Sequence, residues 1–141
     1  MRAVIDTNGL LNAIPKGGSK KWLYNAFIAS SFTWVFSNEI LTEYDELICQ
    51  KFSQDVSNYV LSSLLMATNH QRFEPSYRYN LPLSDPDDAK FVDCAVGANV
   101  DYLVTDDKHI LNLLKIPNLF PPIPIVTFAQ FKRILDNKGQ L

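Results

Sequence analysis

Two stretches, Ala3-Val4-Ile5-Asp6 and Tyr102-Leu103-Val104-Thr105-Asp106-Asp107, give the strongest indication of the architecture of this chain. Each is a short apolar run with β-branched members that ends abruptly in acidic residues. Runs of this kind are typical of strands buried inside a parallel sheet. An open parallel sheet binds its ligands beyond the carboxyl ends of its strands. We therefore expect Asp6, Asp106 and Asp107 to lie at one edge of a common sheet.

Further short strands alternate with helices along the rest of the chain. Additional strands are expected at residues 33–36 and 123–126, with a shorter one at 72–74. Apolar residues at helical spacing predict helices that begin near residues 22, 38, 56, 86, 108 and 127. In contrast, Asn8-Gly9 is interpreted as a break in the chain, and residues 16–21 as a flexible basic loop. This alternation indicates an α/β sandwich with a mostly parallel sheet.

The length and composition fit an ordinary globular protein. The 141 residues suit a single domain that spans 1–141. Hydrophobic residues make up 47% of the chain and charged residues 20%, which excludes a disordered or fibrous protein. Lys and Arg number 13 against 15 Asp and Glu, so the formal net charge is −2. A globally basic nucleic-acid binder is therefore excluded, although a locally basic groove is not.

The cysteines and the N-terminal segment indicate a reducing compartment. Cys49 and Cys94 each stand alone in a predicted helix, so neither a zinc site nor a disulfide scaffold is expected. Both thiols are interpreted as reduced and buried. The chain meets Asp6 after three apolar residues, too few for a signal peptide, and no apolar run approaches a membrane span. We expect a cytoplasmic protein without a membrane partner.

Asp88 is a third carboxylate that the sequence pattern turns inward. Asp85-Pro86 opens a predicted helix, with Asp at the cap and Pro in the first turn. Asp88 precedes apolar positions of that helix by three, four and seven residues, which places it on the buried stripe. Its neighbours Asp87 and Asp93 fall off that stripe. An inward carboxylate at a helix start is stabilised either by the helix dipole or by a cation.

Carboxylates that converge in this way need compensation for their charge. Two like charges about 4 Å apart repel by roughly 4 kcal/mol at an effective dielectric constant of about 20. Either some of the carboxyls take up protons or a divalent cation binds. Oxygen ligands without His or Cys favour Mg²⁺ or Mn²⁺, and such an ion orients a phosphodiester and helps to ionise an attacking water. The structural alternatives are that Asp6 caps a turn, that Asp88 stabilises a helix dipole and that Asp107 caps a helix.

Four segments, in order along the chain, resemble one known family. They are Asp6-Thr7-Asn8, residues 88–95, residues 101–108 and Ile125-Val126-Thr127. Together they resemble the PIN-domain ribonucleases, and most of all the branch of VapC-like toxins of toxin–antitoxin systems. The resemblance spans nearly the whole chain. It implies a three-layer α/β/α sandwich with a mostly parallel central sheet, the PIN-like fold.

The resemblance also implies four catalytic, metal-binding acids, which are Asp6, Glu43, Asp88 and Asp107. Glu39 and Asp93 are the main alternatives to members of this set. The residues expected to support the site are Thr7, Asn8, Thr105 and Asp106, of which Asp106 could trade roles with Asp107. The implied protein is an endoribonuclease that uses Mg²⁺ or Mn²⁺ to hydrolyse RNA, with a cognate antitoxin protein and a homodimer as implied partners. Without the resemblance, Glu43 would belong to a solvated acidic face.

Basic and aromatic residues near these segments are candidates for RNA contacts. Lys16, Lys20 and Lys21 either grip the phosphate backbone or form a solvated loop. Residues 72–79 interleave arginines with aromatic residues, as a platform for single strands would, but core packing and linker chemistry explain them at least as well and are preferred. His70 and His109 are interpreted as surface residues.

Two other functions are weighed against a ribonuclease. A phosphatase with an aspartyl nucleophile usually carries a second acid two residues later, and that position here is Asn8, which argues against this class. The other alternative is a catalytically degenerate PIN-like module that binds RNA or a protein without cutting. The presence of all four acids favours activity over this alternative.

Overall fold

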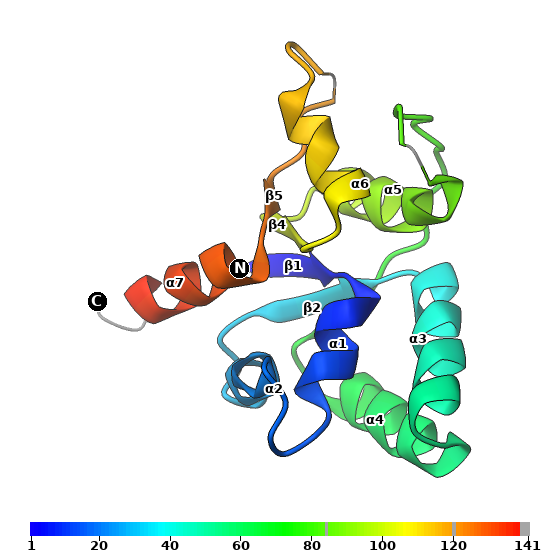
Figure 1. Cartoon of the computed structure of the whole chain (residues 1–141), viewed down its shortest axis with the longest axis vertical. Helices are drawn as coiled ribbons and strands as arrows, with labels where there is room; N and C mark the ends of the chain where they lie inside the picture. The colour runs from blue at the N-terminus through cyan, green and yellow to red at the C-terminus, as the bar shows by residue number, and fades with distance from the viewer. Residues whose placement is uncertain (84, 120, 139–141) are drawn as a thin grey trace.

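The computed structural model describes residues 1–83, 85–119 and 121–138, and its strands form a five-stranded parallel sheet (Figure 1). The strands are β1 (Arg2–Ile5), β2 (Thr33–Phe36), β3 (His70–Arg72), β4 (Tyr102–Val104) and β5 (Ile125–Val126). Their order in the sheet is β3-β2-β1-β4-β5, and each pair of neighbours is parallel. The predicted sheet is confirmed, although the strand expected at 72–74 begins two residues earlier.

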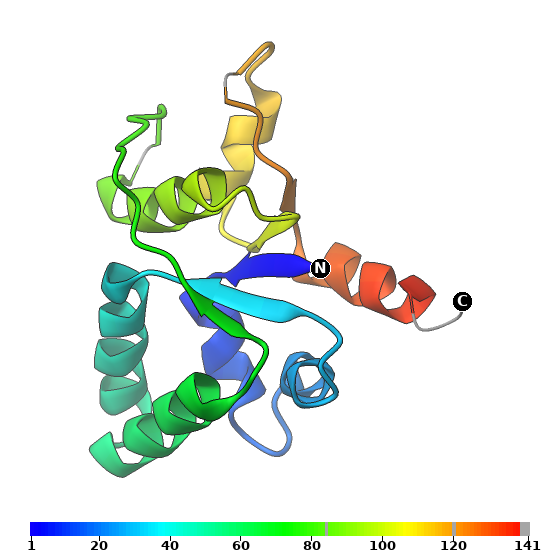
Figure 2. The same ribbon diagram turned by 180° about the vertical axis from the view of Figure 1, so that it is seen from behind.

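Helices cover both faces of this sheet and make it the middle layer of a three-layer α/β sandwich. They are α1 (Thr7–Ala13), α2 (Lys21–Ile28), α3 (Asn38–Lys51), α4 (Gln54–Met66), α5 (Ala89–Gly97), α6 (Lys108–Leu111) and α7 (Phe128–Lys138), with 3₁₀ turns η1 (Pro86–Asp88) and η2 (Asn112–Lys115). In Figure 1, α1 to α4 lie below β1 and β2, whereas α5 and α6 lie above these two strands. Figure 2 shows the same separation from behind.

The strand order creates a switch in chain direction beside β1. From β1 the chain proceeds outward to β2 and β3, and it then crosses back to β4 on the other side of β1. Because crossovers are right-handed, the helices of the two halves fall on opposite faces. The crevice at such a switch, beyond the carboxyl ends of the two central strands, is the usual ligand site of an open parallel sheet. Here it lies beyond Ile5 and Val104, which are partners in register.

Tyr44 of α3 ties that helix to the end of β1. The apolar stripe of α3 places Tyr44 against the sheet, where it is fully buried. Its hydroxyl donates to the carbonyl oxygen of Ile5 at 2.5 Å and accepts from Nε1 of Trp34 at 3.2 Å. Burial raises the pKa of Tyr44, so the hydroxyl keeps its proton and remains a donor. This bond fixes the position of the preceding residue, Glu43, relative to the crevice.

The expected break at Asn8-Gly9 is wrong, because both residues lie within α1. Leu10 and Leu11 bury the apolar face of this helix. A Cβ atom on Gly9 would lie 2.1 Å from Cζ of the Phe128 ring at the start of α7. The glycine therefore serves a close helix-to-ring contact. A sequence pattern does not distinguish such a glycine from one that ends a helix.

The predicted helix starts at residues 85–86 and 127 are confirmed by their caps. Oδ1 of Asp85 accepts the backbone N–H of Asp87 at 3.0 Å. The N–H of Thr127 donates to Oε1 of Gln130 at 2.8 Å, and the N–H of Gln130 donates to the Thr127 hydroxyl at 3.2 Å. These are the reciprocal bonds of a capping box.

Both cysteines are free, as expected, but only Cys94 is buried, and burial raises the pKa of its thiol to about 12. Cys49 is only partly buried, which corrects that part of the expectation. None of the helices in the described ranges combines the length and the apolar character that a membrane span needs.

Candidate active site

Asp6 lies at the carboxyl end of β1, beside β4. Its backbone N–H donates to the carbonyl oxygen of Val104 at 3.0 Å, and the Thr105 hydroxyl donates to its Oδ2 at 2.7 Å. Asp6 is only 6% exposed. Burial, together with the charges of Asp107 and Glu43, raises the pKa of Asp6 to about 6, although the bond from Thr105 acts in the opposite direction. The side chain of Thr105, which was expected to support the metal site, is therefore bonded to the first acid.

Asp88 is buried, as its position in the helical pattern predicted. It ends the 3₁₀ turn η1 and is 8% exposed. Its Oδ2 atom has no hydrogen-bond partner among the described residues. Burial raises the pKa of Asp88 to about 7; the charges of Asp107, Asp85 and Asp6 add to this rise, and His109 opposes it. A buried carboxylate oxygen without a partner is costly, and it indicates a place for a proton or a cation.

Asp107 links the two preceding carboxylates. Its charge acts on both Asp6 and Asp88. Its backbone N–H donates to the Thr105 hydroxyl at 2.9 Å, and its Oδ1 accepts the N–H of His109 at 2.9 Å, which caps α6. Asp107 therefore caps α6, which was the structural alternative, and it also acts on the other acids.

Glu43 is the fourth predicted acid, and both of its oxygens are already engaged. The Thr7 hydroxyl donates to Oε2, and Nζ of Lys90 lies 2.9 Å from Oε1. The side chains of Lys90 and Glu43 are only 18% and 21% exposed. Glu43 is therefore not part of a solvated acidic face. The side chain of Thr7, which was expected to support Asp6, instead holds Glu43.

The four acids are electrostatically coupled, but they do not form a preassembled metal cage. No three His, Cys, Asp or Glu side chains within residues 1–83, 85–119 and 121–138 are arranged, as they stand, to hold one ion. The donor chemistry nevertheless fits a hard divalent cation. The donors are all carboxylate oxygens, two of the carboxyls have a raised pKa, and Oδ2 of Asp88 lacks a partner in the described part of the chain.

Asp93 is buried, which corrects the expectation that it falls off the inward stripe. It is 6% exposed, and its Oδ1 accepts the backbone N–H of Tyr79 at 3.1 Å. The helical pattern failed here because the segment that precedes α5 folds back over this side of the helix. Glu39 is exposed and lies 3.4 Å from Nη2 of Arg78. Both alternative ligands therefore have other partners.

Asp106 and the three candidate lysines lie in two places. Oδ1 of Asp106 accepts the N–H of Phe128 at 3.1 Å, and Oδ2 lies 3.6 Å from Nζ of Lys20. Lys20 therefore borders the acids that follow β4. Lys16 and Lys21 instead line an apolar pocket. Asn8, the remaining support residue, is exposed on α1.

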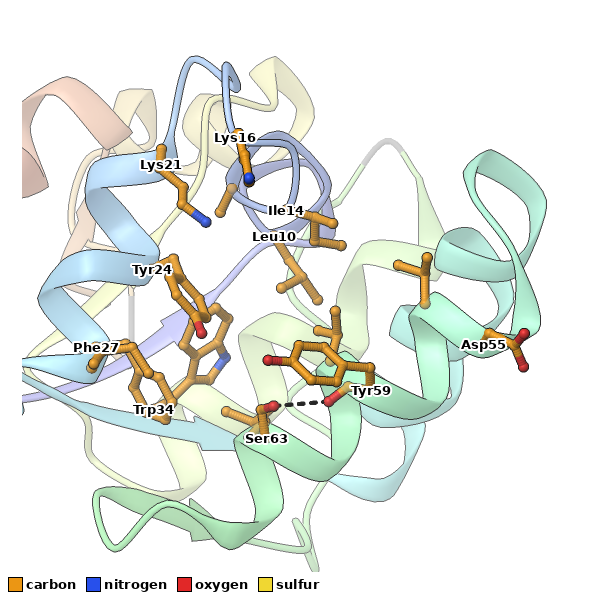
Figure 3. A pocket seen from close by; sticks show the side chains of 15 residues that line it. Leu10, Ile14, Lys16, Lys21, Tyr24, Phe27, Trp34, Asp55, Tyr59 and Ser63 are labelled. Carbon is orange, nitrogen blue, oxygen red and sulfur yellow. Dashed lines mark hydrogen bonds between the residues drawn. The ribbon is translucent and has the colours of Figure 1, made fainter.

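The apolar pocket has a volume of about 480 Å³ and lies between α1, α2, α4 and β2 (Figure 3). Its walls include Leu10, Ile14, Phe27, Trp34, Val60 and Leu64. Tyr59 and Ile28 also line it and remain 70% and 59% exposed. Lys16 and Lys21 lie at one end and Asp55 at the other (Figure 3). An apolar surface with a charged rim is typical of a binding site for another molecule.

Core packing, one part of the preferred interpretation of residues 72–79, applies to Phe73 but not to Tyr77. Phe73 packs against the hydrophobic core. Tyr77 is 70% exposed, and its ring centre lies 5.7 Å from that of Tyr79. The segment therefore presents part of its aromatic surface to solvent.

The sequence analysis assigned no role beside the acids to two residues, Lys90 and His109. Lys90 gave no local signal, because its partner Glu43 is 47 positions away. His109 is exposed, as expected for a surface residue, yet its charge acts on Asp88. The available signal for His109 was its place two residues after Asp107.

Comparisons with known proteins agree with this geometry. A model of the PIN domain matches residues 2–109. The structure is similar to the crystal structure of VapBC2 from Rickettsia felis bound to a DNA fragment from its promoter, with a TM-score of 0.62 and 17% identity over 91% of this chain and 99% of that chain. It is also similar to VapC20 of Mycobacterium tuberculosis, a sarcin–ricin-loop-cleaving toxin, with a TM-score of 0.60 and 11% identity over 79% of this chain and 94% of that one. A search of curated proteins gave no match.

Proposed function

The chain belongs to the PIN-domain family, and on this premise we propose that it is a metal-dependent endoribonuclease, the toxin of a toxin–antitoxin pair. The proposed substrate is RNA, the ion is Mg²⁺ or Mn²⁺, and the reaction hydrolyses a phosphodiester bond. The proposed site is the acidic crevice beyond β1 and β4.

The observation that carries the proposal is the state of Asp88 and Asp6. Oδ2 of Asp88 is buried and has no partner in the described part of the chain, and the pKa of Asp6 is raised to about 6. Buried carboxyls with raised pKa values, at the switch point of a parallel sheet, are typical of a functional site. A divalent cation would compensate both groups at once.

We assign each residue of the crevice a role. Asp6, Asp88 and Asp107 hold the ion, and the Thr105 hydroxyl orients Asp6 through its bond to Oδ2. Lys20, which borders Asp106, lies where it can attract the phosphate backbone. When bound, the ion orients the phosphodiester, lowers the pKa of an attacking water and stabilises the leaving oxygen. Glu43 completes the acidic group and is paired with Lys90.

The similarity to VapBC2 supports a protein partner, and the apolar pocket supports a place for it. We propose that the cognate antitoxin covers the pocket between α1, α2 and α4, where Tyr59 and Ile28 are exposed. A second copy of the chain, as in a homodimer, is the alternative occupant. We also propose that residues 1–141 form one domain and that the protein acts in the cytoplasm, where its thiols stay reduced.

The test is cleavage of a fluorogenic single-stranded RNA by the purified chain with Mn²⁺ or Mg²⁺. Asp6→Asn should lower the cleavage rate by about 100-fold or more, because it removes a charge that the ion needs. Asp136→Asn, which makes the same change on an exposed face of α7, should leave the rate unchanged. Cleavage by Asp6→Asn at the rate of the unchanged protein would show that the assigned site is wrong.

If the protein is instead a PIN-like module that does not cut RNA, the opposite result is expected. In that case the unchanged protein binds the RNA with saturating Mn²⁺ but releases no product. The binding itself, measured by fluorescence anisotropy, distinguishes this outcome from a protein that does not recognise RNA.

A further inference from the structure

We propose that Lys90 is a built-in cation for Glu43. The acidic crevice then takes one divalent ion, held by the three aspartates, and Glu43 is not a ligand of that ion. This inference rests on the proposed metal-dependent function and concerns the role of the fourth acid within it. Lys90 and Glu43 are positioning residues in this arrangement.

The contacts of Glu43 leave neither of its oxygens free. Nζ of Lys90 lies 2.9 Å from Oε1, and the Thr7 hydroxyl donates to Oε2. Thr7 is 2% exposed and directly follows Asp6, so its hydroxyl has little freedom to turn away. An ion bound through Glu43 would have to share an oxygen with one of these partners, and at Oε1 it would meet the like charge of the Lys90 ammonium.

The pair also closes the edge of the sheet. Glu43 comes from α3 and Lys90 from α5, and these helices lie on opposite sides of the strands (Figure 1). Thr7 adds the start of α1. Three elements therefore meet at Glu43. This favours a fixed position of its side chain and not one in which the side chain turns toward an incoming ion.

In the part of the chain that the structure describes, the crevice carboxylates that lack a compensating positive charge are the three aspartates. Among the described residues, the buried side-chain oxygen without a partner belongs to Asp88, whereas Glu43 has two partners. Asp107 acts on both Asp6 and Asp88. One divalent ion suits this group of three. Many nucleases use two metal ions for such a task, and here the Lys90 ammonium supplies a positive charge in place of the second ion.

The other ion pairs among the described residues differ from this one. Arg78 and Glu39 lie 3.4 Å apart with side chains 73% and 58% exposed, and Asp106 in the pair with Lys20 is 54% exposed. Exposed pairs contribute little, whereas removing one partner of a sheltered pair leaves an uncompensated charge. Loss of Lys90 should therefore create a demand for a second cation at Glu43.

The experiment is a Mn²⁺ titration of the purified full chain, with free Mn²⁺ measured by electron paramagnetic resonance. We expect one bound ion per unchanged chain, two for Lys90→Met, and one again for the double variant Lys90→Met with Glu43→Gln. Lys132→Met, an exposed change of the same type on α7, should keep one ion. Glu43→Gln alone should alter the Mn²⁺ affinity by less than threefold, whereas Asp88→Asn should weaken it at least tenfold.

Two results would overturn the inference. One is a single ion on Lys90→Met at saturating Mn²⁺, and the other is a loss of affinity in Glu43→Gln as large as in Asp88→Asn. Circular dichroism checks that each variant is folded, and Lys90→Gln replaces Lys90→Met if the latter is not. Absence of any Mn²⁺ on the unchanged chain would instead contradict the metal-dependent function itself, so the two failures are distinguishable.

Discussion

The acidic crevice and the apolar pocket share one short helix but are built in different ways. Asp6 and Thr7 place the start of α1 in the crevice, whereas Leu10, Ala13 and Ile14 place its second half in the pocket. The crevice collects acids from residues 6 to 107, which are far apart along the chain. The pocket is lined by residues 10 to 64. A ligand in the pocket would therefore contact the same helix that begins in the acidic crevice.

The two regions also carry different energetic costs. In the crevice the cost is electrostatic, since buried carboxyls act on one another and raise their own pKa values. In the pocket the cost is exposure of apolar surface, as Tyr59 shows. A cation removes the first cost and an apolar partner removes the second. The two regions should therefore respond to different changes.

The largest expected effect is that a variant of the crevice loses cleavage activity, whereas a variant of the pocket loses stability. Asp88→Asn should lower RNA cleavage by about 100-fold or more and raise the melting temperature slightly, because repulsion is relieved. Leu64→Ala, in the wall of the pocket, should cost about 2–5 kcal/mol of stability and leave the cleavage rate of the folded fraction unchanged. Cleavage kinetics and thermal melts of both variants check this. Equal loss of cleavage in both would show that the regions are not independent.

The next effect is a pH dependence that belongs to the crevice alone. The pKa values of Asp6 and Asp88 are raised from 3.8 to about 6 and about 7, so the folded chain keeps protons that the unfolded chain has lost. Without metal, stability contributed by these groups should therefore fall as pH rises from about 4 to 7, by about 3 kcal/mol for Asp6.

Denaturant unfolding in EDTA at several pH values measures this dependence. The difference between the unchanged chain and the double variant Asp6→Asn with Asp88→Asn isolates the two carboxyls. Saturating Mn²⁺ should remove most of the fall above pH 6, since it binds the ionised folded form. A difference curve that rises over this range would contradict the assignment.

A smaller effect is expected at the helix that joins the regions. Gly9→Ala places a Cβ atom 2.1 Å from the Phe128 ring, so the start of α7 must shift. We expect a loss of about 1–3 kcal/mol, the usual range for overpacking. Thermal melts measure the loss, and the added variant Phe128→Leu should recover part of it. A more stable Gly9→Ala would show that the contact is not limiting.

The smallest effect is expected on the exposed wall of the pocket. Tyr59 is 70% exposed, so Tyr59→Ser should change stability by no more than about 0.5 kcal/mol and leave cleavage unchanged. If the pocket binds the antitoxin, this variant should weaken inhibition by that protein. A large loss of stability would mean that Tyr59 belongs to the core and not to a binding surface.

Local patterns predicted the parts of the site that depend on strand ends and helical period. Asp6 and Thr105 follow neighbouring parallel strands, and their hydrogen bond of 2.7 Å confirms that they meet. The period of the following helix correctly placed Asp88 inward. The roles of the four acids as ligands stay predictions. The same period misplaced Asp93, because a backbone group from residue 79 covers it.

The remaining features depend on contacts between distant segments, for which one sequence carries no signal. Gly9 within α1 leaves room for the ring of Phe128, and Glu43 is engaged because Lys90 comes from a helix on the other face of the sheet. The succession of strands and helices along the chain, most of the buried stripes and the acids at strand ends follow from local hydrophobic patterns, which act over a few residues. Which charge pairs with which follows from long-range packing, because electrostatic partners are chosen by distance in space and not along the chain.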